Sequence, residues 1–328
     1  MQGLMQDYPL TLVHVFERAE RLFANRKLVT STAAGTERTT YGEWAERVRK
    51  LGGALSELGI GEDGRVGTFA WNTTRHLELY FAPSCTGRVL HTLNVRLFPE
   101  QLVYVVNHAE DEVVFVDRSL VQVLWPHIDE LESVRHVVVM DDGKGDVPED
   151  PRIVDYEELL ESAPAAEFHV EDEQRAAAMC YTSGTTGNPK GVVYSHRSVF
   201  LHSMGSMIAD TIGIRETDVV MPVVPMFHAN AWGLPHAATF AGAAQVFPGP
   251  NLAPDHLVDL IERERVTVTA GVPTIWMGVL PLLEGRDVSS LRALPCGGSA
   301  VPKILSEGFR DKTGMPILHA WGMTETSP

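Results

Sequence analysis

The stretch Tyr181-Thr-Ser-Gly-Thr-Thr-Gly-Asn-Pro-Lys-Gly191 joins two short apolar runs, residues 177–182 and 191–195, and each run predicts a β-strand. The stretch contains three glycines, four hydroxyl side chains of serine and threonine, and one lysine. Glycine lets the backbone turn sharply and approach a ligand closely, while hydroxyls, free N–H groups and lysine bind phosphate oxygens. The spacing G-x-x-G-x-x-K is not that of a P-loop NTPase. A plain turn would not need all of these residue types together, so we interpret the stretch as a phosphate-binding loop.

Strand-like and helix-like segments alternate on both sides of this loop. Apolar runs predict further strands at residues 66–71, 89–93, 113–116, 136–140, 218–222, 244–247, 266–270, 291–295 and 317–319. Helical periodicity and capping signals predict helices at about residues 11–25, 40–58, 99–108, 156–162, 197–212, 229–241, 254–264, 273–284 and 302–312. This alternation predicts an α/β fold in which mainly parallel strands are covered by helices.

Chain length suggests two structural units. At roughly 150 residues per domain, 328 residues correspond to about two units. Residues 141–173 hold several glycines and prolines and carry 13 acidic side chains against two basic ones, which is typical of a solvated surface connection. We therefore expect a first α/β subdomain at residues 1–165 and a second one, with the phosphate loop, at residues 166–328.

Composition excludes several classes of function. Hydrophobic residues make up 44% of the chain, which indicates a globular protein, and the net charge of −16 argues against binding to nucleic acids. The three cysteines, Cys85, Cys180 and Cys296, are far apart, which favours a reducing cytoplasm over a disulfide framework. The first eight residues do not form a signal peptide. We therefore expect a cytoplasmic protein.

One long stretch carries no charge. Residues 219–254 contain no Asp, Glu, Lys or Arg. A membrane-spanning helix needs about 20 mostly apolar residues, and prolines and histidines interrupt this stretch too often. Two interpretations stay open: the stretch is buried α/β core, or it is core that also lines an apolar pocket. In either case we expect at most peripheral membrane contact.

Five motifs occur along the chain in a fixed order. They are Thr40-Tyr-Gly-Glu-Trp44, Leu93-Asn-Val-Arg-Leu97, the loop from Tyr181 to Gly191, Pro225-Met-Phe-His228 and Trp321-Gly-Met-Thr-Glu325. Together, and over essentially the whole chain, they resemble the motifs of acyl-adenylate-forming enzymes: acyl-CoA synthetases, luciferases and peptide-synthetase adenylation domains. The segment around Trp232 is most similar to bacterial long- and medium-chain fatty acyl-CoA synthetases. The resemblance implies two packed, mainly parallel sheets flanked by helices.

The resemblance also implies a reaction. In such ligases a carboxylate attacks the α-phosphorus of ATP and releases pyrophosphate, after which the thiol of coenzyme A displaces AMP. The first step brings an anion against a polyanion, so the site must supply positive potential, partly through Mg²⁺. By resemblance, Lys190, His228, Thr324 and Glu325 are the catalytic residues, and Thr182 and Glu325 are the metal ligands.

The binding residues follow from the same motifs. By resemblance, the nucleotide contacts Thr182, Ser183, Gly184, Thr185, Thr186, Gly187, Lys190, His228, Ala229, Trp232, Gly298, Ser299, His319, Ala320, Trp321 and Thr324. The family commonly has tyrosine where this chain has Trp321, and tryptophan still allows stacking on adenine. His228 and Trp232 are expected to contact the fatty acid, with Trp232 as the gate of the acyl tunnel.

Other functions stay open. One is a nucleotide- or acyl-binding module without catalysis, and another is adenylation of a different acid, including luciferase-type use of the adenylate. An amino-acid substrate would need a buried carboxylate for its ammonium group, and residues 219–254 contain none. The family's later motifs, which include a lid-domain lysine, are not found in these 328 residues, so we expect these residues alone to be inactive. A homodimer is left open.

Overall fold

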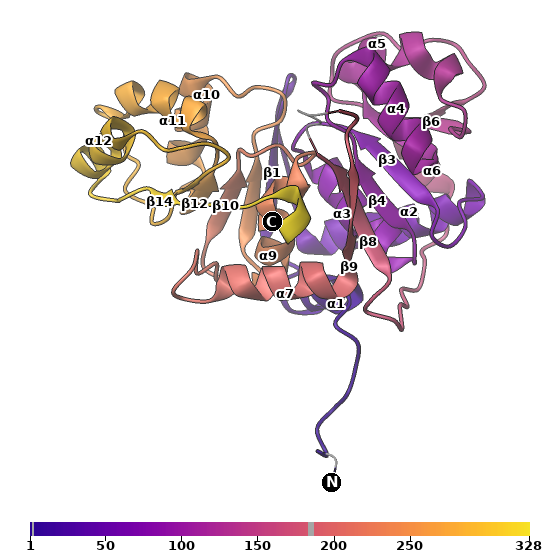
Figure 1. Cartoon of the computed structure of the whole chain (residues 1–328), viewed down its shortest axis with the longest axis horizontal. Helices are drawn as coiled ribbons and strands as arrows, with labels where there is room; N and C mark the ends of the chain where they lie inside the picture. The colour runs from indigo at the N-terminus through magenta and orange to yellow at the C-terminus, as the bar shows by residue number, and fades with distance from the viewer. Residues whose placement is uncertain (2, 183–186) are drawn as a thin grey trace.

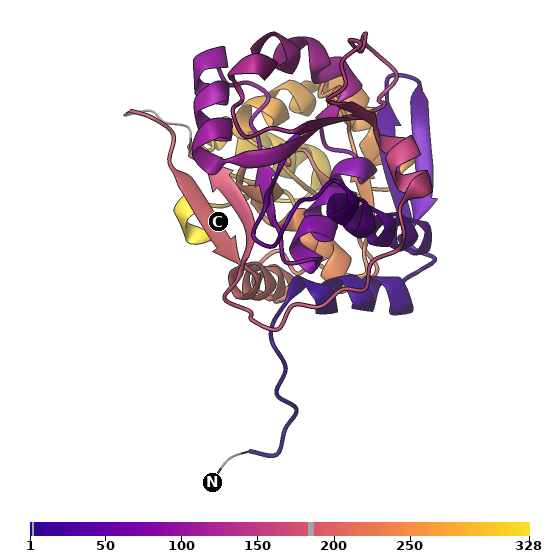
Figure 2. The ribbon, with the colours of Figure 1, turned by 90° about the vertical axis from the view of Figure 1, so that its right-hand side faces the viewer.

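A seven-stranded sheet forms one side of the computed structural model, which describes residues 1, 3–182 and 187–328 (Figures 1 and 2). Its order is β7 (Ile153–Asp155), β6 (His136–Met140), β5 (Asp111–Asp117), β3 (Arg65–Phe69), β4 (Val89–Thr92), β8 (Ala176–Tyr181) and β9 (Gly191–Ser195). All neighbouring strands are parallel except the pair β8–β9. The β8–β9 hairpin therefore closes one edge of the sheet.

A five-stranded sheet forms the second layer of strands in the described residues. Its order is β12 (Val268–Ala270), β10 (Val219–Pro222), β11 (Ala244–Phe247), β1 (Lys27–Thr32) and β2 (Gly35–Thr40), with only β1 and β2 antiparallel. A small parallel pair, β13 (Pro295–Cys296) and β14 (Leu318–His319), continues this side of the molecule. The expected class of fold, mainly parallel sheets flanked by helices, is confirmed.

Helices cover the sheets and connect the strands (Figure 1). The α-helices are α1 (Leu12–Leu22), α2 (Tyr41–Glu57), α3 (Thr74–Cys85), α4 (Pro99–Ala109), α5 (Val121–Leu124), α6 (Tyr156–Ser162), α7 (His196–Met207), α8 (Ala229–Trp232), α9 (Leu234–Ala241), α10 (Pro254–Arg263), α11 (Pro273–Val279) and α12 (Lys303–Thr313). Short 3₁₀ turns are η1 (Arg118–Leu120), η2 (Trp125–Glu130), η3 (Leu280–Leu283) and η4 (Thr324–Thr326).

The largest hydrophobic core joins the first three helices to both sheets. Phe16 of α1, Trp44 of α2 and Phe81 of α3 are fully buried, and the Trp44 ring lies 5.3 Å from Phe16 and 5.2 Å from Phe81 between centroids. Aromatic side chains of this size contribute much of the apolar area removed from water. This core fixes the position of one sheet relative to the other. It thereby also fixes the relative positions of the loops at the ends of their strands.

Most predicted elements occur within a few residues of their expected positions. The capping box at the start of α2 is confirmed, because the Thr40 hydroxyl accepts from Glu43 N and the Glu43 carboxylate accepts from Thr40 N. The sequence pattern misses β1, β2 and β7, since β2 is polar on both faces and β7 has only three residues. The helix expected from residue 229 is wrong in its first turn, which winds left-handed.

The boundary expected at residue 165 does not separate the sheets. β8 and β9 come after it but belong to the sheet of β3 to β7, and β1 and β2 come before it but pair with the sheet of β10 to β12. The division into residues 1–165 and 166–328 therefore does not coincide with a division between sheets, and as a division into folding units it stays a prediction.

The uncharged stretch 219–254 forms β10, α8, α9 and β11, and most of it is buried. Among the described helices, none has the length and hydropathy that a membrane span requires.

Candidate active site

The ends of the predicted phosphate loop meet at the tip of the β8–β9 hairpin. Thr182 N donates to Lys190 O at 3.0 Å, and Lys190 N donates to Thr182 Oγ1 at 3.2 Å. The Lys190 side chain is exposed, and Gly187 has a φ of 126°, a conformation that favours glycine. Ser183, Gly184, Thr185 and Thr186 lie outside the described residues. The two strands expected on either side of the loop are confirmed as β8 and β9.

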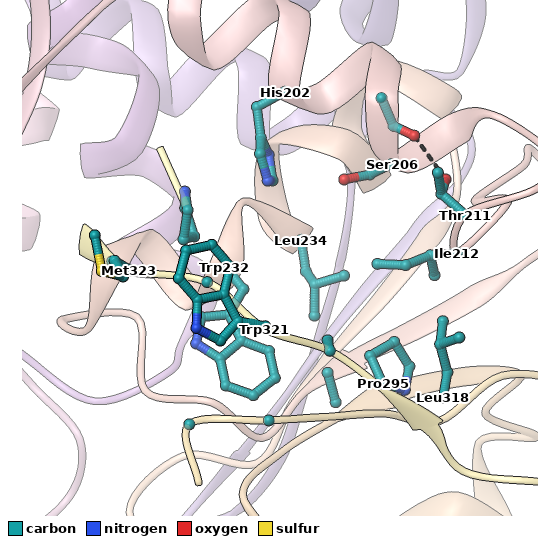
Figure 3. Close-up of a pocket in the computed structure, with 18 of the residues that line it drawn as sticks. His202, Ser206, Thr211, Ile212, Trp232, Leu234, Pro295, Leu318, Trp321 and Met323 are labelled. Carbon is teal, nitrogen blue, oxygen red and sulfur yellow. Dashed lines mark hydrogen bonds between the residues drawn. The ribbon is translucent and has the colours of Figure 1, made fainter. Parts of the chain in front are cut away.

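A cavity of about 430 Å³ lies between α7, α8 and the small β13–β14 sheet (Figure 3). Seven of the predicted site residues line it: His228, Ala229, Trp232, Gly298, Ala320, Trp321 and Thr324. The structure therefore brings together residues from motifs almost 100 positions apart. Three others, Ser299, His319 and Glu325, are exposed and do not line this cavity.

The cavity wall contains a left-handed turn. Ala229, Asn230, Ala231 and Trp232 have φ values of 43°, 52°, 51° and 55°. Such a conformation costs roughly 1–2 kcal/mol for each residue other than glycine, so surrounding contacts must hold it. Cys180, near the end of β8, donates from Sγ to Asn230 Oδ1 at 2.8 Å. This contact attaches the turn to the strand that leads into the phosphate loop.

The Trp232 side chain at the end of this turn lies against two glycines, Gly297 and Gly298. A Cβ on Gly297 would lie 3.6 Å from the indole of Trp232, and one on Gly298 would lie 3.8 Å from it. The indole therefore packs against the backbone where the adenine slot is expected. Trp321, from the C-terminal motif, is 79% exposed and borders the same cavity (Figure 3). A movement of Trp232 would change the space available at this slot.

His228 precedes the turn and faces two cavities. It lines the large cavity and also a small one that it shares with Thr182. Although its ring is exposed on the wall, neighbouring atoms lower the pKa of His228 by desolvation. Its neutral form is therefore favoured near pH 7, and a neutral imidazole can donate a hydrogen bond to an incoming carboxylate or phosphate.

The C-terminal motif is attached to the hairpin by one hydrogen bond. The Tyr194 hydroxyl of β9 donates to Thr324 O at 2.6 Å. Burial raises the pKa of Tyr194, and the charge of Glu325 raises it further, which places Glu325 close to β9.

The two expected metal donors fit Mg²⁺ only together with a substrate. Within the described residues, no cluster of three or more His, Cys, Asp or Glu side chains forms a metal site. Mg²⁺ is commonly bound by one or two carboxylates together with substrate phosphates. Exposed Glu325 and the hydroxyl of Thr182 are oxygen donors of the right chemistry for that type of site.

Sequence reasoning misses the residue that holds the His228 segment in place. Buried Asn72 donates from Nδ2 to Pro222 O at 2.8 Å and to Val224 O at 2.9 Å, and its Oδ1 accepts from Met226 N at 2.7 Å. Asn72 follows directly after a predicted strand. The carboxyl ends of neighbouring parallel strands are a usual place for ligand-binding segments in α/β proteins, and that position was the available signal.

Sequence reasoning also misses the wall that α7 contributes. His202, Gly205 and Ser206 line the cavity together with Thr211, opposite Leu318 of β14 (Figure 3). Neither α7 nor Thr211 belongs to a recognised motif, so only the tertiary structure brings them to the site.

Comparisons with known proteins agree with this geometry. The chain is 46% identical over its full length to the 3-methylmercaptopropionyl-CoA ligase of Ruegeria lacuscaerulensis and covers 62% of that protein. It is also 46% identical over 99% of its length to the long-chain-fatty-acid–CoA ligase of Thermus thermophilus, of which it covers 59%. The chain thus spans about three fifths of the length of these curated relatives.

Solved structures show the same fold. The anthranilate CoA ligase AuaEII, crystallised with anthranoyl-AMP, superposes on the whole chain with a TM-score of 0.88 at 22% identity, and the chain covers 62% of it. Residues 16–328 match the family described as AMP-binding enzyme. The ordered motifs, the loop between β8 and β9, and these matches lead to one conclusion: the chain belongs to the AMP-binding enzyme family, the acyl-adenylate-forming enzymes.

Proposed function

We propose that the protein carrying this chain is an AMP-forming fatty acid–CoA ligase that uses ATP, Mg²⁺ and coenzyme A. The observation that carries this proposal is the convergence of His228, Trp232, Gly298 and Thr324 on one cavity beside the ends of the phosphate loop. The 46% identity to two acyl-CoA ligases supports the same class of reaction.

The proposed chemistry has two steps. A carboxylate oxygen of the acid attacks the α-phosphorus of ATP, and the bond to the bridging oxygen breaks so that pyrophosphate leaves with its electron pair. The thiol sulfur of coenzyme A then attacks the acyl carbon, AMP leaves, and the thiol proton passes to a base or to solvent. Both steps depend on holding two reactants in line, which can lower a barrier by several kcal/mol.

The side chains of this protein divide these tasks. Lys190 and the loop N–H groups offset phosphate charge, Thr324 contacts the α-phosphate, and neutral His228 orients the carboxylate by donating a hydrogen bond. Thr182 and Glu325 would hold Mg²⁺, which supplies positive charge to the phosphates when bound. Ser299 and His319 line the approach to adenine from outside the cavity. These assignments remain proposals for each residue.

The acyl chain is proposed to extend along the apolar part of the cavity. Leu234, Ile212, Leu318 and Pro295 supply much of this wall (Figure 3). An alkyl tail in such surroundings is removed from water without any buried charge left unpaired. The cavity therefore favours an acid with an apolar chain over an amino acid.

An acid series tests this substrate class. Each buried methylene contributes about 0.8 kcal/mol, so kcat/KM for hexanoate should exceed that for acetate by about 10²-fold. The assay is pyrophosphate release followed by thioester formation with coenzyme A, in the complete natural protein. Equal use of acetate, or preference for an amino acid, would contradict the assignment.

A short thioether acid is the second candidate substrate. The Ruegeria relative is named for 3-methylmercaptopropionate, and the α7 wall adds polar His202 and Ser206 to the cavity. Including 3-methylmercaptopropionate in the acid series separates the candidates. A kcat/KM above that for hexanoate favours the thioether acid, and a lower value favours the fatty acid.

Trp232→Ala should change the use of the acid more than the use of ATP. The indole lies on the cavity wall beside Gly297 and Gly298, and its removal enlarges the cavity that the acyl chain is proposed to occupy. We expect kcat/KM for hexanoate to change by about tenfold, while KM for ATP stays within about threefold. The control is Trp125→Ala in η2, outside the cavity. Unchanged acid dependence in a folded variant would contradict the gate assignment.

Other expectations stay proposals. A protein made of these 328 residues alone is expected to bind nucleotide weakly and to fail at the overall reaction, since they match about 60% of the length of active relatives. A non-catalytic binding module is the alternative, and pyrophosphate exchange by the complete natural protein would exclude it. The cytoplasmic location and the state of oligomerisation also remain predictions.

A further inference from the structure

His91 of β4 and Asp111 of β5 form a buried pair beside the proposed active site. His91 Nδ1 lies 2.9 and 2.8 Å from the two carboxylate oxygens, and both side chains are fully buried. Strand β3 runs between β4 and β5, and Gly67 is the register partner of His91. A Cβ on Gly67 would lie 3.2 Å from Asp111 Oδ2. Glycine at position 67 therefore leaves the space in which the pair meets across the middle strand.

His91 also lines a small cavity at the site. Nε2 is buried and has no hydrogen-bond partner among the described residues. A cavity of about 20 Å³ is lined by His91, Thr182 and His228, together with side chains from β4 and α4. A cavity of this size has room for one water molecule where polar groups can hold it, and His91, Thr182 and His228 supply such groups. A buried nitrogen without a hydrogen-bond partner destabilises a protein. A group in this cavity that donates a hydrogen bond to Nε2 would remove this destabilisation.

The local geometry determines what that group must do. A carboxylate at Asp111 can only accept, so Nδ1 carries the proton and Nε2 is the ring nitrogen left to accept. The Thr182 hydroxyl oxygen accepts from Lys190 N at 3.2 Å, which leaves its own proton free to be donated. Tyr181 covers His91, with 5.0 Å between the ring centroids. The small cavity therefore lies beneath the residue that begins the phosphate loop.

We propose that His91, oriented by Asp111, is a positioning residue for the adenylation step: its Nε2 accepts from one water molecule that also contacts Thr182 and His228. This inference rests on the proposed function. The water would hold the Thr182 hydroxyl and the His228 imidazole in the orientation that lines up the acid with the α-phosphate. A misplaced contact of this kind lowers kcat more than substrate affinity.

Two conservative variants of His91 distinguish a role in positioning the active site from a purely structural role. In His91→Asn the amide nitrogen takes the place of Nδ1 and keeps the bond to Asp111, but nothing reaches the small cavity. In His91→Gln the longer amide reaches the place of Nε2, but Asp111 loses its partner. A structural pair and a positioning residue therefore rank these variants in opposite orders.

The assay is ATP–pyrophosphate exchange by the complete natural protein, with urea unfolding of each variant. We expect His91→Asn to lower kcat by about tenfold, the effect of one hydrogen bond, with KM for ATP within about twofold and an unfolding midpoint near that of the wild type. We expect His91→Gln to keep kcat within about threefold but to unfold at lower urea concentration, because Asp111 is left buried and unpaired. The reverse ranking, or full kcat in His91→Asn, would overturn the proposal.

A matched control is available on α3. His76 is also fully buried, and its ring nitrogens lie 3.0 Å from Thr68 Oγ1 and 2.9 Å from Trp71 O. His76→Asn should lower the unfolding midpoint and leave kcat of the folded protein unchanged. If it lowers kcat as much as His91→Asn, the effect is a general consequence of losing a buried histidine and the proposal fails.

A crystal structure supplies a readout that does not depend on turnover. A water molecule within hydrogen-bond distance of His91 Nε2 and Thr182 Oγ1 supports the proposal, and a direct bond between these two side chains overturns it. The wild-type exchange assay tests the proposed function separately. No exchange with any acid refutes the function itself, whereas wild-type exchange that His91→Asn leaves intact refutes only the role of His91.

Discussion

Replacing Glu325 by glutamine is expected to lower the rate of adenylate formation by about 10²–10³-fold, the usual consequence of removing one charged group that stabilises a transition state. Glu325 is exposed and lies close to β9, where Tyr194 attaches the C-terminal motif to the phosphate-loop hairpin. Glutamine keeps the shape of the side chain but removes the negative charge with which a carboxylate binds magnesium. The measurement is ATP–pyrophosphate exchange in the complete natural protein over a range of Mg²⁺ concentrations.

The control for this prediction is a carboxylate outside the site. Glu307 on α12 is exposed and pairs with Lys303, so Glu307→Gln should leave the exchange rate within about twofold. If Glu325 binds the metal, a higher Mg²⁺ concentration should restore part of the lost rate. A Glu325→Gln variant with a wild-type rate would show that the metal carboxylate lies elsewhere.

Replacing Asn72 by alanine is expected to lower the free energy of unfolding by about 3–5 kcal/mol. The side chain makes three buried hydrogen bonds, to Pro222 O, Val224 O and Met226 N. Leaving a buried polar group without a partner costs about 1–3 kcal/mol, and alanine removes the Asn72 side chain as a partner of all three backbone groups. Urea unfolding of the 328-residue chain measures the change.

An exposed asparagine provides the comparison. Asn251 accepts one hydrogen bond from Ala253 N at the surface, so Asn251→Ala should cost less than about 1 kcal/mol. Because Asn72 holds the segment that ends at His228, the alanine variant should also bind nucleotide more weakly. A loss of stability no greater than that of Asn251→Ala would show that water replaces the side chain in its absence.

Local patterns in the sequence were sufficient for most of the fold. Strand and helix positions follow from short-range features, such as the apolar run at β6 (His136–Met140) and the capping box of Thr40 and Glu43. Strand β2 is missed because an exposed, polar strand has no apolar alternation, and β1 is missed although four of its six residues are buried. The place of β1 is set by pairing with β11, where Leu28 lies opposite Gln245, and no local signal encodes a partner more than 200 residues away.

The site divides in the same way. The motif residues that line the cavity could be named from the sequence by resemblance, because each motif is a short string. The residues that hold these motif residues in place could not be named from the sequence. Asn72 reaches the segment before His228 from another strand end, and α7 supplies a wall without any motif.

By itself, the sequence determined the α/β alternation, the loop between residues 181 and 191, and the family. The tertiary structure decided which sheets those elements share, the left-handed turn at residues 229–232, and the meeting of His91 with Asp111 across Gly67. The physical reason is the range of the interactions. Propensity and capping act within a few residues, whereas a strained turn and a buried, hydrogen-bonded His–Asp pair persist only because distant strands supply hydrogen bonds and exclude water.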